Sequence, residues 1–168
     1  YDVDTGVTEG IIIALKGATA LNLLLLGLVY FGWKWLWKKI PLLNKLLFPD
    51  LNGEWEMTIH WRWGNKEGVA QATAHIKQDF LKMSMEVSSE DSDSSTLLAK
   101  PQKDPESGRA ILYYIYRNTP KLKNGNLSLP YKGTAILKLD HTSFNLLEGN
   151  YYTDRSTTGY YELKRKCI

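Results

Sequence analysis

Two segments of the chain carry side chains that together could bind a small anionic nucleotide. Tyrosine rings stack on nucleobases, an arginine guanidinium forms paired hydrogen bonds with phosphate, and hydroxyl and amide groups bond to base and ribose edges. The candidates from the two segments are Tyr114, Tyr116, Asn118, Thr153, Arg155 and Thr158. The same residues also fit an ordinary exposed hairpin in which Asp154 pairs with Arg155, and composition alone favours that simpler interpretation.

Residues that could carry out catalysis are scarce. The three histidines, His60, His75 and His141, are far apart in the sequence, and the one cysteine, Cys167, is the penultimate residue. The sequence has no nucleophile-elbow, P-loop or zinc-protease motif. We therefore expect neither an enzyme, nor a metal site, nor a bound cofactor.

The elements that must position the candidate site show a period of two. In residues 54–63, apolar and polar residues alternate, which is the pattern of a half-buried strand. The apolar members are Trp55, Met57, Ile59, Trp61 and Trp63. Seven further segments have strand character and are separated by turn-forming residues. The eight expected strands are 54–63, 69–78, 81–88, 94–100, 109–118, 131–140, 144–152 and 157–166.

Eight short strands joined by turns predict an all-β fold, an eight-stranded up-and-down β-barrel, with a two-sheet sandwich as the alternative. A closed eight-stranded barrel has no exposed edge and leaves room for packed side chains or one small ligand. Gly53 and Trp55 at the start of the first strand predict an indole that closes one end of the barrel.

The N-terminal part of the chain predicts a transmembrane α-helix over residues 11–37. Residues 11–33 are almost wholly apolar, and at about 1.5 Å per residue they form a helix of roughly 34 Å. Trp33, Trp35 and Trp37 then alternate with lysine and leucine, as is typical of a headgroup layer. A cleaved signal peptide fits less well because the basic residues follow the apolar run. A buried core helix fits less well because Leu and Ile cover all its faces.

Charge predicts the orientation of this helix. Acidic residues precede the apolar run and lysines follow it, so the positive-inside rule places the remainder of the chain in the cytoplasm. The expected order is a periplasmic segment at 1–10, the helix at 11–37, an amphipathic juxtamembrane stretch at 38–50 and a cytoplasmic barrel domain at 51–168. The net charge of +3 argues against a nucleic acid polymer as partner.

Polar and small residues within the apolar run suggest contact between copies of the helix. Lys16 and Asn22 cost free energy in lipid unless they face a partner helix or reach toward the headgroups. Gly17 and Gly27 would allow helices to approach closely, although they lack GxxxG spacing. Both interpretations of Lys16 stay open, and the polar residues favour a homo-oligomer over a simple tether.

Six stretches, in order along the cytoplasmic part, resemble a known family. They are PDLNGEW (49–55), IKQDF (76–80), SDSS (92–95), YIYRNTP (114–120), GTAIL (133–137) and LEGNYYTDRSTTG (147–159). Together, behind a membrane helix, they are similar to the two-transmembrane, β-strand-rich effectors of bacterial CBASS anti-phage systems, also called SMODS-associating effectors.

This resemblance implies a β-barrel receptor for a cyclic dinucleotide that a partner nucleotidyltransferase makes during infection. It also implies ligand-driven oligomerisation, disruption of the bacterial inner membrane and death of the infected cell. In related receptors the nucleotide instead holds the effector inactive, and the sequence does not decide between the two responses. The family has two transmembrane helices whereas this chain shows one, and residues 1–10 would suit a periplasmic loop after a first helix.

Under this hypothesis Arg155 is the expected phosphate clamp. The other candidates are expected to stack, pack or make polar contacts: Tyr114, Tyr116, Asn118, Thr153 and Thr158. A shift of one residue in the inward face would exchange these assignments. Two other classes stay open, namely a lipid- or fatty-acid-binding barrel with an apolar cavity and a structural anchor with a filled barrel that docks a partner protein.

Overall fold

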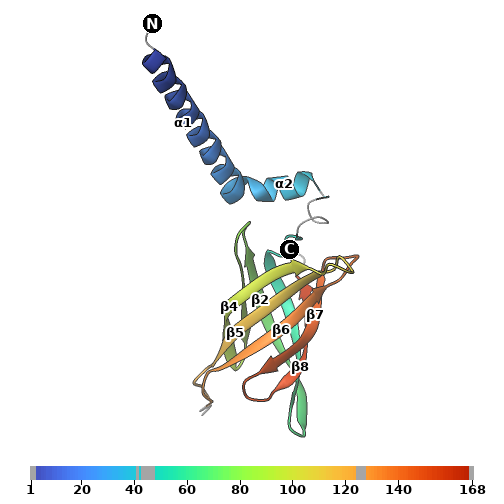
Figure 1. Ribbon diagram of the computed structural model, residues 1–168. Coiled ribbons are helices and arrows are strands. Elements are labelled where there is room, and N and C mark those ends of the chain that lie inside the picture. The colour runs from blue at the N-terminus through green and yellow to red at the C-terminus, as the bar shows by residue number, and fades with distance from the viewer. Residues whose placement is uncertain (1–2, 41, 43–47, 124–127, 167–168) are drawn as a thin grey trace. The chain divides into compact units, whose positions relative to one another are not determined.

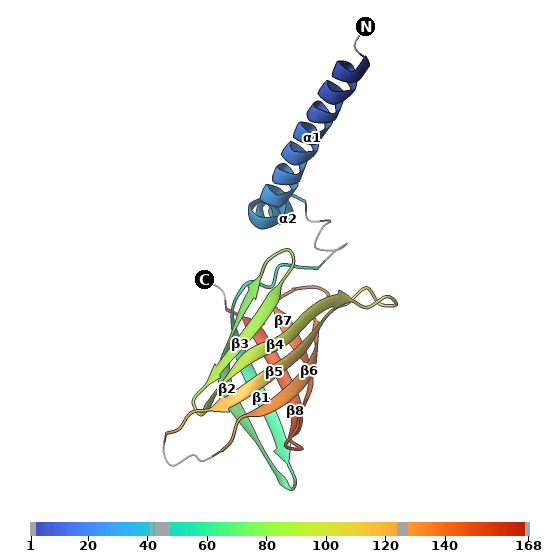
Figure 2. The same cartoon turned by 60° about the vertical axis from the view of Figure 1, so that its left-hand side comes forward.

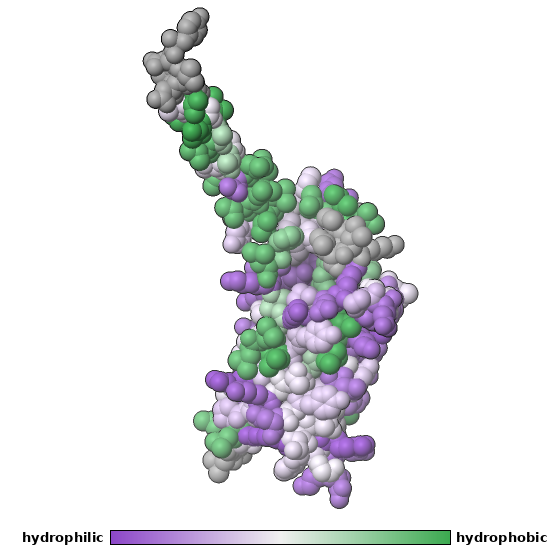
Figure 3. Space-filling model, in the orientation of Figure 1, coloured by the Kyte–Doolittle hydropathy of each residue, from purple (hydrophilic) through white to green (hydrophobic). Residues whose placement is uncertain are grey.

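The computed structural model describes residues 3–40, 42, 48–123 and 128–166, and it divides into a helical unit, residues 1–40, and a barrel unit, residues 41–168. In the helical unit, α1 (Val3–Gly27) is followed by a π-helical turn, η1 (Leu28–Gly32), and by α2 (Trp33–Lys39). Most of the described side chains of this unit on the face shown in Figure 3 are apolar, and many large apolar residues of the helix are exposed. By length and composition, the stretch Val7–Lys39 could cross a membrane.

The first helix begins earlier than predicted. Residues 3–10, predicted as part of a separate periplasmic segment, are helical. No proline interrupts them, and Gly6 and Gly10 each lower helix propensity by only about 1 kcal/mol. The predicted amphipathic stretch at 38–50 falls largely outside the described residues.

The residues predicted to contact lipid or a second helix lie on this unit. The polar and small ones are all exposed on the single helix: Lys16, Gly17, Asn22 and Gly27. Trp33 and Trp37 meet edge to face with ring centroids 5.6 Å apart, whereas Trp35 is exposed. Their contacts with lipid or with another copy stay predictions.

The barrel unit confirms the predicted eight-stranded antiparallel barrel (Figures 1 and 2). Its strands are β1 (Gly53–Trp63), β2 (Lys66–Gln78), β3 (Met83–Ser89), β4 (Ser92–Lys103), β5 (Ala110–Pro120), β6 (Tyr131–Leu139), β7 (Leu146–Thr153) and β8 (Thr158–Arg165). Each strand pairs with the next in sequence, and β8 pairs with β1. This last pairing closes the sheet and excludes the two-sheet sandwich.

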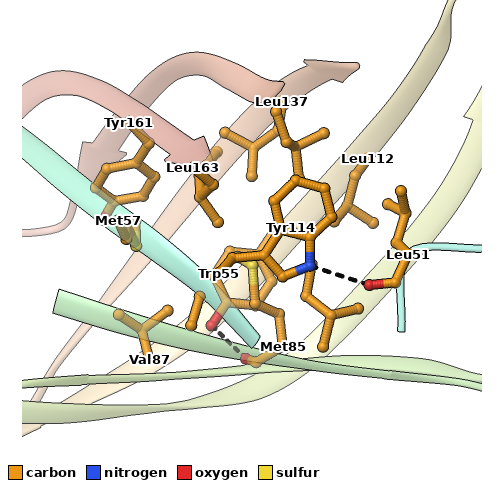
Figure 4. Close-up of a cluster of buried hydrophobic side chains, with 14 of the residues drawn as sticks. Leu51, Trp55, Met57, Met85, Val87, Leu112, Tyr114, Leu137, Tyr161 and Leu163 are labelled. Atoms are coloured by element: carbon orange, nitrogen blue, oxygen red, sulfur yellow. Dashed lines mark hydrogen bonds between the residues drawn. The ribbon is translucent and has the colours of Figure 1, made fainter. Parts of the chain in front are cut away.

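One end of the barrel, which we call the closed end, is filled by apolar side chains. It lies where β1 begins and β8 ends, toward the C label in Figure 1. Trp55 is fully buried there, as predicted, and its indole N–H donates to the Leu51 carbonyl at 3.1 Å (Figure 4). Arg165 lies with its guanidinium carbon 5.0 Å from the Trp55 ring centroid and donates to the Asp50 carbonyl at 2.6 Å. The segment before β1 and the start of β1 are thereby held against β8, the last strand.

The opposite end, which we call the mouth, is formed by the turns between β1 and β2, β3 and β4, and β7 and β8, together with the ends of β5 and β6. The β1–β2 turn marks it at the lower end of the barrel in Figure 1. The fully buried side chains belong to the closed end and the middle of the barrel, and burial decreases along β1 toward Trp63, which is 58% exposed. The inside of the barrel is therefore filled at one end and open to solvent at the other.

Glycines let neighbouring strands and large side chains approach closely inside the barrel. A Cβ at Gly149 would lie 1.9 Å from the backbone oxygen of Ile136 on β6, and a Cβ at Gly133 would lie 2.3 Å from the Tyr116 ring. A backbone atom cannot rotate away as a side chain can. The strand pairing between β6 and β7 therefore depends on glycine at position 149.

We expect Gly149→Ala to lower the free energy of unfolding by about 1–3 kcal/mol or more, because β6 and β7 must separate to admit the methyl group. Gly68→Ala is the matched comparison, since the obstructing atoms belong to the side chain of Trp61 next to open space at the mouth. Denaturant unfolding of both variants measures the difference. Equal loss of stability in the two would show that the β6–β7 approach is not tight.

Candidate functional site

The mouth of the barrel contains a cavity of about 770 Å³. This volume lies within the ~300–1,000 Å³ that is usual for small-molecule sites. Its lining comes from all eight strands and the turns between them: Ile59, Trp61, Trp63, Ala70, Ser89, Asp91, Ser92, Asn118, Ser128, Tyr131, Tyr151, Thr153, Arg155, Thr157 and Tyr161. The lining mixes aromatic, hydroxyl, amide, carboxylate and guanidinium groups, so it can hold a ligand that is both aromatic and charged.

The cavity has an apolar wall on β1 and β2. Ile59, Trp61 and Trp63 are alternate residues of β1 on its inner face, and Ala70 lies opposite Ile59 on β2. A Cβ at Gly68 would come within 2.6 Å of the Trp61 ring, so the indole packs directly on the β2 backbone. This packing holds a large aromatic surface at the cavity wall, where a base or another flat group could stack.

Tyrosines form the floor of the cavity. Tyr151 and Tyr161 stack with ring centroids 4.1 Å apart and 12° between their planes. The Tyr161 hydroxyl lies 2.7 Å from that of Tyr116, which in turn stacks on Tyr114 at 5.0 Å. Ring stacking and this hydroxyl contact join the cavity floor to the core beneath it.

Burial keeps these phenols protonated. Loss of solvation raises the pKa of Tyr114 and of Tyr151 to about 12, and it raises the pKa of Tyr161 as well. They can donate hydrogen bonds to a ligand or to one another at physiological pH, but they cannot act as bases or repel an anion.

The raised pKa values predict loss of barrel stability in alkali. Below about pH 10 the phenols are protonated in both states. Above it the unfolded chain loses protons that the folded barrel retains, so stability falls as the pH rises from about 10 to about 12. Denaturant unfolding across this range measures the slope, and Tyr151→Phe should make it shallower. An unchanged slope in that variant would show that Tyr151 ionises as readily in the barrel as in the unfolded chain.

Arg155 supplies the cation of the cavity lining from the turn between β7 and β8. Its guanidinium carbon lies 4.6 Å from the Tyr131 ring centroid, and its Nη2 donates to the Leu129 carbonyl. The half-buried side chain is thus directed across the end of β6 and retains further N–H groups for an anion. A phosphate is the natural ligand for such a group.

The alternative pairing of Asp154 with Arg155 is wrong. The Asp154 carboxylate accepts a hydrogen bond from the Lys132 N–H at 3.0 Å, and the Asp154 N–H donates to the Lys132 carbonyl. Through these two hydrogen bonds Asp154 holds the turn against β6. The chain reverses at Ser156, which has a positive φ of 60°. Arg155 is left facing the cavity.

The structure brings three of the six predicted ligand residues to the cavity: Asn118, Thr153 and Arg155. Tyr114 and Tyr116 lie on the inner face but deeper, at 1% and 3% exposure, and the Tyr114 hydroxyl donates to the Met85 carbonyl at 2.7 Å (Figure 4). They support the floor from below. Thr158 lies on the outer face, because Gly159 and Tyr161 of β8 face inward. We therefore leave these three residues out of the proposed contact set.

Several lining residues were absent from the predicted site, although the sequence carried a signal for most of them. Trp61 and Trp63 share the alternation that predicted β1, and Tyr151 and Tyr161 have the same parity as buried residues of their strands. Tyr131 likewise has the parity of the buried Leu137 and Leu139 on β6. Ser92 had no such signal, because it begins a run of serines and aspartate in which no apolar residue marks the inward face.

A second depression, of about 600 Å³, lies on the outer face around β1, β7 and β8. Its cation Arg62 already pairs with Glu67 at 3.0 Å, and both side chains are largely exposed. It is less suited to hold an anion than the cavity at the mouth, where Arg155 is half-buried and forms no ion pair with the other described residues. Within the described ranges, no three metal-ligating side chains are grouped so as to hold a metal ion.

Comparison with known proteins gives two matches that cover the barrel. Residues 46–165 match the family described as Cap15, cyclic dinucleotide receptor domain. The chain is also 31% identical over 147 residues to CD-NTase-associated protein 15 of Staphylococcus schleiferi, and the match covers 88% of this chain and 75% of that protein. The family match includes all eight strands and every residue of the cavity lining.

Proposed function

This chain belongs to the Cap15 cyclic dinucleotide receptor family, and from that premise we propose that its barrel binds a cyclic dinucleotide in the cavity at the mouth. Each nucleotide of such a ligand offers an anionic phosphate and a flat base. Arg155 and the indole of Trp61 are complementary to these two groups and line the same cavity. The observation that carries the proposal is this pairing of a half-buried guanidinium with an aromatic wall inside the receptor domain.

The proposed contacts follow from position in the cavity. Arg155 binds phosphate, Trp61 and Tyr131 face the bases or the ribose, and Asn118 and Thr153 supply polar contacts. The rings of Tyr151 and Tyr161 form the base of the site.

We propose further that the chain is an effector of anti-phage defence in the bacterial inner membrane. The apolar helix would anchor a cytoplasmic barrel, a partner nucleotidyltransferase would supply the nucleotide, and oligomers of the helix would disrupt the membrane. Lys16 and Asn22 in the helix support association, since polar side chains in lipid are stabilised by a partner helix. Dye release from vesicles that contain the full chain, with and without nucleotide, distinguishes activation by the ligand from restraint by it.

Two other functions are less well supported. A barrel that binds fatty acids would have an apolar cavity, whereas this one is lined by Asp91, Asn118 and Arg155 among other polar residues. A purely structural anchor would have a filled barrel, whereas the mouth holds an open cavity. Both observations favour a polar, aromatic ligand.

Calorimetric titration of the full chain in nanodiscs with a panel of cyclic dinucleotides tests the proposal. We expect binding of at least one member at micromolar concentration or below, with one site per barrel. Empty nanodiscs and linear dinucleotides are the controls. Absence of binding across the panel by a folded chain would overturn the proposed ligand class.

A further inference from the structure

The side chain of Asn118 has an unused hydrogen-bonding group at the cavity. Its Nδ2 donates to the Ser92 hydroxyl at 3.0 Å, whereas its Oδ1 is buried and has no hydrogen-bond partner among the described residues. A buried acceptor without a donor is unfavourable in a folded protein, and such groups in native structures commonly have a functional reason. Because Asn118 lines the cavity, a ligand bound there could supply the donor.

The surroundings of Asn118 favour a donor and disfavour a phosphate. Ser89 and Ser92 contribute hydroxyl oxygens nearby, and Asp91 adds a carboxylate from the same turn. The Asp91 carboxylate disfavours a phosphate there, and the nearby cation Lys121 is already paired with Asp93 at 3.0 Å. The edge of a nucleobase that carries an amino group or a ring N–H has the required donors.

The position of Arg155 separates the phosphate from this acceptor wall. Asn118 lies on β5 directly opposite Tyr131 of β6, and Arg155, from the turn after β7, has its guanidinium carbon 4.6 Å from the Tyr131 ring centroid. β5 and β7 are two strand spacings apart, which is about 10 Å. One nucleotide can bridge such a distance with its phosphate at one end and its base edge at the other.

The opposite wall suits the face of the same base. β1 and β5 are four strands apart in the closed eight-stranded barrel, so Trp61 lies across the cavity from Asn118. The indole is held against β2 by its contact with Gly68. The cavity thus offers an aromatic surface on one side and hydrogen-bond acceptors on the other.

From these observations we infer that Asn118 determines base specificity by accepting a hydrogen bond from an N–H group on the base edge. The inference rests on the proposed function and names the part of the ligand that the acceptor wall recognises. It assigns the phosphate to Arg155 and the base edge to Asn118. Removing the N–H donor from the base should therefore weaken binding only when the side chain at position 118 has a hydrogen-bond acceptor.

Matched pairs of ligands test this inference by the ratio of their affinities. The probes are cyclic di-GMP with cyclic di-IMP, which lacks the 2-amino groups, and cyclic di-AMP with its analogue lacking the 6-amino groups. For the pair whose amino group is recognised, we expect the full chain in nanodiscs to prefer the amino-bearing member by roughly tenfold to a hundredfold. We expect that ratio to fall near one in Asn118→Ala and to persist in Asn118→Asp, which keeps an acceptor.

The controls separate this inference from its alternatives. Asn150→Ala changes an asparagine on the outer face of β7 and should leave the ratio unchanged. A preference that survives in Asn118→Ala, or is lost in Asn118→Asp, would overturn the assignment. Discrimination that instead follows the 2′-hydroxyl in deoxyribose analogues would assign Asn118 to the ribose and also overturn it. Absence of binding by every probe to the unmodified chain would overturn the proposed function itself.

Discussion

Replacing Arg155 with alanine is expected to weaken cyclic dinucleotide binding by roughly tenfold to a hundredfold while the barrel stays folded. A hydrogen bond to a charged group contributes about 1.5–3 kcal/mol, and Arg155 is the cation that lines the cavity among the described residues. Its own contacts, with the Tyr131 ring and the Leu129 carbonyl, lie at the mouth and not in the core. Calorimetric titration of the variant measures the loss of affinity.

Arg62→Ala is the matched control for this experiment. Arg62 lies near the same end of the barrel, on the outer face of β1, and pairs with Glu67 in solvent. Both substitutions remove one positive charge from the mouth region, so a general electrostatic effect would weaken binding equally in the two variants. Equal loss would contradict a specific phosphate contact by Arg155, and unchanged affinity in Arg155→Ala would remove the residue from the site.

Replacing Trp55 with alanine is expected to cause the largest loss of stability, about 3–5 kcal/mol. The indole is fully buried at the closed end, donates to the Leu51 carbonyl and packs beside Arg165. Its removal leaves a cavity and removes the contacts of the indole with Leu51, before β1, and with Arg165, at the end of β8. Since domains of this size are stable by only about 5–15 kcal/mol, the variant should unfold at a markedly lower temperature or fail to fold.

Trp63→Ala provides the comparison for Trp55. It removes the same side chain from the same face of the same strand, but at the mouth, where the indole is 58% exposed. Thermal unfolding followed by near-ultraviolet circular dichroism should show a small change for Trp63→Ala and a large one for Trp55→Ala. Similar losses in the two variants would contradict the division of the barrel into a packed end and an open end.

The period-two pattern predicted the barrel well because each strand has one buried face. In β1 the alternation from Trp55 to Trp63 predicts which residues point inward, and the structure confirms it. Strand ends were less predictable. β4, predicted over 94–100, extends from Ser92 to Lys103, and its register shifts between Thr96 and Leu98. Such a bulge has no clear signature in one sequence, because it depends on the neighbouring strand.

The site was only partly predictable for a related reason. Alternation predicts the inward face but not the depth, so Tyr114 and Tyr116 could not be distinguished from residues at the mouth until the register of β5 was known. Thr158 was predicted together with Arg155. In that turn and in β8, however, the inward-facing residues have odd numbers, as Arg155 and Tyr161 do. Parity with Leu163 would have excluded it. The unpaired oxygen of Asn118 could not be predicted at all, because it depends on the exact position of Ser92.

The helical unit accords with an effector that acts at a membrane. The stretch Val7–Lys39 is apolar enough to cross a bilayer by length and composition. Within it the Thr19 hydroxyl donates to the Leu15 carbonyl at 2.8 Å, which satisfies that polar group inside the helix. Lys16 and Asn22 have polar groups that a neighbouring helix could satisfy. They are therefore the first positions to substitute in a study of association.

Photo-crosslinking tests the central claim, that the cavity at the mouth is the nucleotide site, most directly. The full chain in nanodiscs would be irradiated with a photoreactive cyclic dinucleotide and digested, and the modified residues located by mass spectrometry. A nucleotide site at the mouth predicts adducts on inward-facing residues such as Tyr131, Tyr151 and Tyr161, which excess unmodified nucleotide prevents. Specific adducts on the outer face instead, at His60, Tyr152 or Tyr160, would contradict it.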